Sequence, residues 1–222
     1  MIFFDIDDTL LDHKASQDAA ALAFAIKYSD HIENPAAFPA AWHKITKRHM
    51  TCYLSGKISF QEQRRRRIQE SLPLQLSAAE TDKIFDDYYQ SYEASWRLFP
   101  EVEDVLHKLS DLHLGIITNG DKEQQCYKLE KLGIHKHFHQ VITPTCAGEA
   151  KPAPAIFKFA ASQADKSINQ CWYIGDNHST DYLGAKNAGF RSVWLNRSGS
   201  KAQCDSQCRD LNEFLLTLEE EF

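Results

Sequence analysis

The chain has 222 residues, of which 31 are acidic and 25 are basic, so its formal net charge at pH 7 is −6. A composition with 43% hydrophobic and 25% charged residues is typical of a globular protein and excludes an intrinsically disordered one. The acidic balance argues against a general nucleic-acid-binding protein, although a local site can still bind a phosphorylated substrate.

No stretch of the sequence approaches the roughly 18 to 20 apolar residues that span a bilayer. The longest apolar stretch covers residues 19–26 only. The first four residues run directly into Asp5 without a basic segment, which favours a core strand over a signal peptide. We therefore expect a cytoplasmic protein with no membrane partner.

The six cysteines are scattered along a chain that is too long to need a disulfide scaffold, so we expect reduced thiols. Cys204 and Cys208 form a CxxxC pair. No second pair at zinc-site spacing accompanies them, and we expect neither a metal nor a disulfide there.

Short apolar runs and amphipathic segments alternate along most of the chain. Between the later runs, apolar residues recur at helical spacing, as at Val102, Val105 and Leu106, and Gly189 is placed to end a helix over 181–188. This alternation predicts βαβ units and an α/β fold with a Rossmann-like parallel sheet. The predicted strands cover residues 2–6, 112–118, 140–143, 171–174 and 192–195.

One region, residues 14–96, breaks the alternation because it contains no convincing strand. We predict an inserted all-helical cap domain there, with Ser77 and Glu80 as a capping box, and a catalytic core built from residues 1–13 and 97–222. The helices of the insert are expected at residues 15–29, 36–54, 59–71 and 77–95.

In a parallel α/β sheet, ligands bind at the carboxyl ends of the strands. One DxDxT segment alone is weak evidence, because an isolated aspartate pair is usually a turn or a helix cap. Four groups that each lie at a predicted strand end, in the order acid, hydroxyl and amide, base, acid, indicate an active site. Their members are Asp5 and Asp7, Thr118 and Asn119, Lys151, and Asp176 with Asp181.

These segments resemble the four motifs of the haloacid dehalogenase (HAD) superfamily. The motifs are FFDIDDTL, IITNG, the lysine of AKPAPAIF, and GDNHSTD. The resemblance spans the chain, since the helical insert resembles the C1 cap of that superfamily. The C-terminal half is most similar to the nucleotidase-like branch of capped HAD phosphatases, which implies a nucleoside 5′-monophosphate as a candidate substrate.

The chemistry of these residues points to phosphoryl transfer. Carboxylates that converge on one site repel each other, so we expect a divalent cation, and hard oxygen ligands favour Mg²⁺. Asp5 is expected to be the nucleophile that forms an aspartyl-phosphate, and Asp7 to act as general acid and then general base. Lys151 would offset negative charge on the nucleophile and the transferring group.

The remaining site residues have supporting parts in this interpretation. Thr118 and the backbone around Asn119 would hold the phosphoryl oxygens. Asp5 and Asp176 would be metal ligands, with Asp181 a direct ligand or a partner of one. The backbone carbonyl of Asp7 is added to the metal ligands by the resemblance alone.

Other reactions remain open, because one fold supports several chemistries. The alternatives are a sugar phosphomutase, a 2-haloacid dehalogenase and a catalytically idle binding module. Asp7 favours phosphoryl transfer, since dehalogenation needs no proton donor for the leaving halide. The expected partner is a small phosphorylated metabolite, without nucleic acid, and the expected assembly is a monomer or a homodimer.

Two features of the insert have competing interpretations. One or two of the arginines at residues 64–67 could reach a substrate, or the run could be a solvated helix face; consecutive helical residues point about 100° apart, so they cannot all face one way. Trp42, Tyr88 and Tyr92 could stack on a base, although core packing is the favoured interpretation.

The alternating histidines His135, His137 and His139 would lie on one side of a strand, as in a metal site. We expect instead a surface loop that leads into the third strand.

Overall fold

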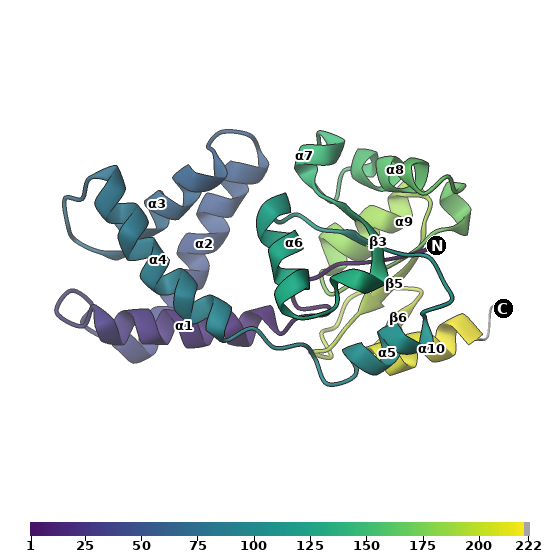
Figure 1. The fold of residues 1–222 in the computed structure, drawn as a ribbon, viewed down its shortest axis with the longest axis horizontal. Helices are drawn as coiled ribbons and strands as arrows, with labels where there is room; N and C mark the ends of the chain where they lie inside the picture. The colour runs from purple at the N-terminus through teal and green to yellow at the C-terminus, as the bar shows by residue number, and fades with distance from the viewer. Residues whose placement is uncertain (220–222) are drawn as a thin grey trace. The chain divides into compact units, whose positions relative to one another are not determined.

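The computed structural model describes residues 1–219, and the chain divides into two compact units (Figure 1). One unit combines Met1–Asp12 with the chain from Leu98 onward, and the other is His13–Arg97.

The first unit is built on a parallel sheet with the strand order β3-β2-β1-β4-β5-β6 over the described residues. Its strands are β1 (Ile2–Phe4), β2 (Leu114–Ile117), β3 (Phe138–Ile142), β4 (Trp172–Gly175), β5 (Arg191–Leu195) and β6 (Gln207–Cys208). Its α-helices are α5 (Val102–Lys108), α6 (Lys122–Lys131), α7 (Pro144–Ala147), α8 (Pro154–Gln163), α9 (Gly184–Ala188) and α10 (Leu211–Glu219). Short 3₁₀ helices cover His135–His137 and Ile168–Gln170, and a π-helix covers His178–Leu183.

Hydrophobic side chains on both faces of this sheet pack against helices. Successive side chains of a strand point to opposite faces, and β1 shows the consequence. Phe3 packs in a cluster with Phe157 of α8, whereas the ring of Phe4 meets that of Phe214 of α10. Helices α8 and α9 therefore cover one face, and α5 and α10 lie together on the other (Figure 1). A parallel sheet that is covered on both faces needs strands as apolar as β1 and β2.

The second unit is all-helical in His13–Arg97. It consists of α1 (His13–Lys27), a 3₁₀ turn (Pro35–Ala37), α2 (Phe38–Leu54), α3 (Phe60–Ser71) and α4 (Ala78–Ala94). The capping box predicted at Ser77 and Glu80 is confirmed: the Ser77 hydroxyl accepts from the Glu80 backbone N–H, and the Glu80 carboxylate accepts from that of Ser77. The Ser59 hydroxyl caps the start of α3 by accepting from the backbone N–H of Glu62.

The prediction of an α/β fold with a parallel sheet is confirmed, but three element predictions need correction. The third strand begins at Phe138 rather than at residue 140, because Phe138 is buried and pairs with Leu114. The helix expected from residue 181 begins as the π-helix at His178. The two-residue strand β6 was not predicted, since two residues are too short to show a period-2 pattern.

None of the helices within residues 1–219 combines the length with the hydrophobicity that a bilayer crossing requires.

Candidate active site

Two carboxylates stand side by side at the carboxyl end of the sheet because β1 and β4 are neighbouring parallel strands. Phe4 is in register with Ile174, and the backbone N–H of Asp5 donates to the carbonyl of Ile174 over 3.0 Å. β1 ends at Phe4 and β4 ends at Gly175, so the residues that follow the two strands are Asp5 and Asp176. Asp5 and Asp176 therefore emerge together at the edge where ligands bind in this fold class.

Asp181 returns to the same place through the π-helix. Its carboxylate accepts from the backbone N–H of Asn177 over 3.0 Å, and it is 1% exposed. Gly175 leaves the room for it, since a Cβ at that position would lie 2.6 Å from the Asp181 carboxylate. A glycine at the end of β4 is thus required by close approach of a side chain rather than by a turn.

Asp5, Asp176 and Asp181 form the one set of three or more potential metal ligands among the described residues. Their nearest ligand oxygens all lie within 4.8 Å of one another. Burial raises the pKa of Asp5 to about 7, assisted by Asp181 and Asp7 and opposed by Lys151. Burial, and then the charges of Asp181 and Asp5, raise the pKa of Asp176 to about 9. The protein alone cannot keep this cluster fully ionised at neutral pH.

Lys151 supplies a positive charge to the cluster. Its ammonium donates to Asp5 Oδ1, Asp181 Oδ1 and the Tyr173 hydroxyl, each over 2.7 Å. Burial alone would lower the pKa of Lys151, but Asp181 and Asp5 raise it above its ordinary value. The Tyr173 hydroxyl in turn donates to the carbonyl of Ile117 over 2.9 Å. Three acceptors arranged around one ammonium fix its position.

The backbone of Lys151 is fixed by Asn119, which follows β2. The Asn119 amide donates to the carbonyl of Lys151 over 2.9 Å and accepts from its N–H over 2.8 Å. The side chain of Asn119 therefore positions Lys151. The expected contact between the Asn119 backbone and phosphoryl oxygens stays a prediction.

The loop after β1 is hydrogen-bonded to the end of the neighbouring strand β4. Asp8 has φ +60°, a left-handed conformation that aspartate tolerates better than most residues, and its N–H donates to the carbonyl of Leu11. The Thr9 hydroxyl accepts from the backbone N–H of Asp176 over 3.1 Å. Asp8 and Thr9 thus shape the loop after β1.

The carboxylate of Asp7 is held from helix α6. Lys128 donates to its Oδ1 over 2.5 Å, and the Gln125 amide donates to its Oδ2 over 3.0 Å. The same amide donates to the Thr118 hydroxyl over 2.9 Å, and that hydroxyl also accepts from the Gly120 N–H over 3.2 Å. Both lone pairs of the hydroxyl are occupied, so its proton is available to donate to a ligand.

The sequence-predicted residues therefore lie in two groups. The first contains the three carboxylates with Lys151 and Asn119, and the second contains Asp7 with Thr118. Sequence reasoning missed Tyr173, Gln125 and Lys128, which are all buried. A signal for two of them existed: Gln125 and Lys128 are spaced i, i+4 from the apolar residues Leu129 and Leu132, which predicts a shared helix face.

The arginine run of the helical unit spreads over several faces of α3, as its helical spacing requires. Arg65 forms a bidentate pair with Asp82, at 2.7 Å for both bonds. Arg66 donates to Glu62 one turn earlier over 2.8 Å. Two of the four arginines are thus engaged in surface ion pairs, which add little stability.

Arg67 and three aromatic residues belong to the interior of that unit. The Arg67 guanidinium lies 4.5 Å from the ring centroid of Trp42 and 5.3 Å from that of Tyr88. Trp42, Tyr88 and Tyr92 are each at most 4% exposed, and the ring of Tyr88 contacts those of both Trp42 and Tyr92. Core packing, the favoured interpretation of these aromatics, is confirmed.

The three alternating histidines do not share a strand. His135 and His137 belong to a 3₁₀ turn, and His139 follows within β3, where its ring stacks on His113 with centroids 4.5 Å apart.

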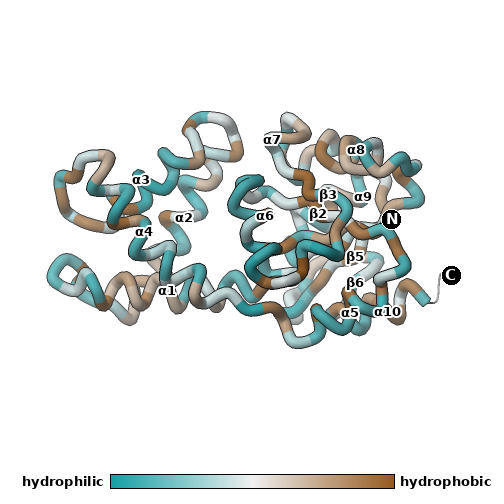
Figure 2. The backbone as a smooth tube through the Cα atoms, in the orientation of Figure 1, coloured by the Kyte–Doolittle hydropathy of each residue, from teal (hydrophilic) through white to brown (hydrophobic). Residues whose placement is uncertain are grey.

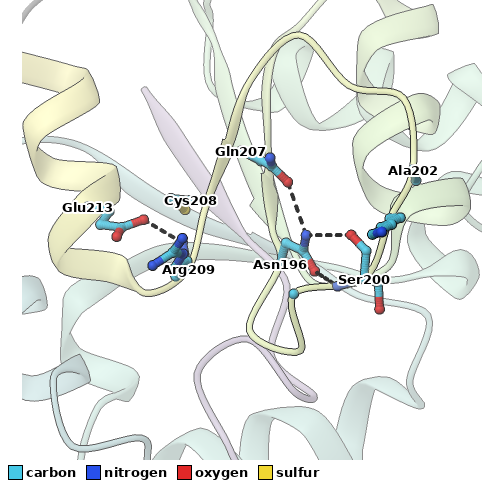
Figure 3. A pocket seen from close by; sticks show the side chains of 9 residues that line it. Asn196, Ser200, Ala202, Gln207, Cys208, Arg209 and Glu213 are labelled. Carbon is cyan, nitrogen blue, oxygen red and sulfur yellow. Dashed lines mark hydrogen bonds between the residues drawn. The ribbon is translucent and has the colours of Figure 1, made fainter.

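A hollow of about 890 Å³ lies farther along the same edge, between the loop after β5 and the start of α10 (Figure 3). Its polar groups bond to one another. The Asn196 amide donates to the carbonyl of Ser200 and to Gln207, and the Arg209 N–H donates to Glu213. None of the predicted site residues lines it, so the chemistry converges at β1 and β4 instead.

Comparison with known proteins identifies the family of the chain. A family model described as haloacid dehalogenase-like hydrolase matches residues 1–189. The N-acylneuraminate-9-phosphatase of Rattus norvegicus is 27% identical over 89% of this chain and 83% of its own length. The glyceraldehyde 3-phosphate phosphatase of Pyrococcus abyssi is 29% identical over 88% and 80%. Among solved structures, the HAD-hydrolase YfnB from Bacillus subtilis, bound to magnesium, has a TM-score of 0.83 at 22% identity, covering 98% of this chain and 97% of its own.

Proposed function

Because the chain belongs to the haloacid dehalogenase-like hydrolase family, we propose that it is a Mg²⁺-dependent phosphatase that works through an aspartyl-phosphate on Asp5. The observation that carries the proposal is the contact of the Lys151 ammonium with both Asp5 and Asp181, next to Asp176. Phosphatase names among the relatives support the same reaction class.

The donor set fits magnesium. Three carboxylates whose oxygens lie within 4.8 Å of one another offer the hard oxygen ligands that Mg²⁺ prefers. Asp5, Asp176 and Asp181 would hold it, with the backbone carbonyl of Asp7 as a further candidate. When bound, the cation would neutralise the carboxylates and charge on the phosphoryl oxygens.

The proposed first half-reaction uses Asp5 as nucleophile and Asp7 as general acid. A carboxylate oxygen of Asp5 attacks phosphorus, and the bond from phosphorus to the leaving oxygen breaks. The leaving oxygen takes a proton from Asp7. Lys151 offsets the negative charge that gathers on Asp5 and the phosphoryl group, and the Thr118 hydroxyl donates to a phosphoryl oxygen.

The second half-reaction returns the enzyme to its starting state. Asp7, now ionised, takes a proton from water, and the water oxygen attacks phosphorus. The bond between phosphorus and Asp5 breaks, which releases inorganic phosphate and the free carboxylate. One carboxyl group thus serves as acid and then as base. A dehalogenase has no need of such a group, so Asp7 supports the phosphatase over that alternative.

The proposed substrate is a small phosphomonoester, and two classes compete. The motif resemblance favours nucleoside 5′-monophosphates. The names of the relatives favour phosphates of sugars and sugar acids.

Phosphate release across a panel of nucleoside monophosphates, sugar phosphates and phosphoglycolate tests the proposal. We expect release that requires Mg²⁺ and stops with EDTA, and the preferred class identifies the substrate. Release of halide from a 2-haloacid, or interconversion of sugar phosphates without net phosphate, would replace the phosphatase with one of its rivals. No turnover of any kind would favour an idle binding module.

Magnesium should stabilise the protein more at high pH than at low pH. The folded pKa values of Asp5 and Asp176 are raised, so the metal-free fold loses stability as the pH rises from about 4 through about 7 and about 9, respectively. Bound cation removes that loss. At a Mg²⁺ concentration of about 100 Kd, the gain is about 2.7 kcal/mol, or roughly 5–11 °C in Tm.

Thermal unfolding at pH 5.5 and pH 8, with EDTA or with Mg²⁺, measures this effect. Asp176→Asn is the matched control, since it should lose most of the Mg²⁺-dependent shift. A shift that is equal at both pH values, or one that survives in Asp176→Asn, would contradict the metal site.

A further inference from the structure

Helix α6 buries polar side chains although its sequence is mostly hydrophilic (Figure 2). Gln125 and Lys128 are each 1% exposed and, three residues apart, lie on one face of the helix. A buried ammonium is costly unless a charge and hydrogen bonds compensate it. Lys128 meets that need through the carboxylate of Asp7, which lies 2.5 Å away.

The two side chains donate hydrogen bonds to different oxygens of the same carboxylate. Lys128 donates to Oδ1 of Asp7 and Gln125 donates to Oδ2. Two donors on two oxygens restrict rotation of the carboxylate plane as well as the position of the group. The Gln125 amide also reaches the Thr118 hydroxyl, so Asp7 and Thr118 are fixed against a single group.

The local fold at the start of α6 allows these hydrogen bonds to form. Asp121 caps α6 by accepting from the backbone N–H of Gln124, which sets where the helix begins after β2. Gly120 leaves room for the Gln125 side chain, because a Cβ there would lie 2.4 Å from the amide nitrogen. The glycine, the N-cap and the position at which the helix begins together place the Gln125 amide.

We propose that Lys128 and Gln125 are positioning residues that hold the Asp7 carboxylate in line for proton transfer to the leaving oxygen. This inference rests on the proposed phosphatase function. Both residues act through Asp7 and not on the phosphoryl group. Their loss therefore slows phosphoenzyme formation in proportion to the need for a proton on the leaving group, and it slows phosphoenzyme hydrolysis equally for every substrate.

The test compares leaving groups in Lys128→Met. With p-nitrophenyl phosphate the leaving phenolate departs without a proton, and we expect the single-turnover rate of phosphoenzyme formation to stay within about fivefold of wild type. With the alkyl phosphate that the wild type hydrolyses fastest, we expect the rate of phosphoenzyme formation to fall about 100-fold with little change in the half-saturating substrate concentration, which is the lower range for loss of general acid–base catalysis. Gln125→Leu should show the same split with a smaller loss, and Lys128→Arg should recover part of the alkyl activity.

Controls separate positioning from general damage. Lys122→Met removes an exposed lysine from the same helix and should leave both substrates unaffected. Asp7→Asn should show the split of Lys128→Met, and the double variant should be no slower than Asp7→Asn, because residues that act as a unit are not additive. Equal losses in the rate of phosphoenzyme formation from both substrates in Lys128→Met, or additive losses in the double variant, would overturn the proposal.

A stability measurement keeps the inference testable if a variant is inactive or folds poorly. Asp7→Asn leaves the buried Lys128 ammonium without this carboxylate, so its Tm should fall, and Asp7→Asn/Lys128→Met should recover part of the loss. No recovery would count against the coupling. A wild type that releases no phosphate while this thermal cycle behaves as expected would refute the proposed function and leave the Asp7–Lys128 coupling standing.

Discussion

Asp5→Asn is expected to abolish turnover while the protein remains folded. The amide has the shape of the carboxylate but is a far weaker nucleophile, so no aspartyl-phosphate forms. Removing the nucleophile of an enzyme that forms a covalent intermediate costs factors of about 10⁴ or more in kcat. The fold should tolerate the change, since Lys151 keeps Asp181 and Tyr173 as partners and the repulsion among the carboxylates falls.

Phosphate release and thermal unfolding of the same preparation test this expectation. Asp111→Asn is the control, because it makes the same chemical change at an exposed position. Trapping of phosphoenzyme by acid quench should label the wild type and not Asp5→Asn. Substantial activity in a well-folded Asp5→Asn protein would refute nucleophilic catalysis by Asp5.

The carboxyl ends of the strands were predictable because two simple rules combine there. Short apolar runs give strands, and parallel strands end at one edge, so residues such as Asp5 and Asp176 could be placed together from the sequence alone. The burial of Asp181 and the bond from Asn119 to Lys151 were not predictable. Each depends on how a loop folds back, and local patterns do not contain that information.

The residues that hold the site were harder to predict than those that form it. Tyr173 looks like any aromatic strand residue, and only the packed structure shows its hydroxyl against Lys151. Lys128 lies 121 positions from Asp7, and a lysine in a hydrophilic helix is normally a surface residue. What identifies such groups is burial of a charge, which a single sequence does not reveal.

Lys151→Met is the variant for which we expect the largest combined loss of activity and stability. Met keeps the length of the side chain and removes the ammonium, so Asp5 and Asp181 lose their shared counter-charge. Loss of electrostatic stabilisation of this kind lowers kcat by about 10²–10³-fold or more. Removing one partner from a buried ion pair costs about 3–5 kcal/mol of the free energy of unfolding.

The destabilisation by Lys151→Met should grow with pH, since Lys151 is the group that holds the pKa of Asp5 down. Without it that pKa rises further above its unfolded value, so stability is retained below about pH 4 and is lost as the pH rises through the folded pKa. Urea denaturation at pH 5 and pH 8 measures the difference, with Lys158→Met, an exposed lysine of α8, as control. Mg²⁺ should restore part of the lost stability at pH 8, because a cation at Asp5, Asp176 and Asp181 replaces the missing charge. A destabilisation that is independent of both pH and Mg²⁺ would mean that Lys151 contributes packing rather than charge to this site.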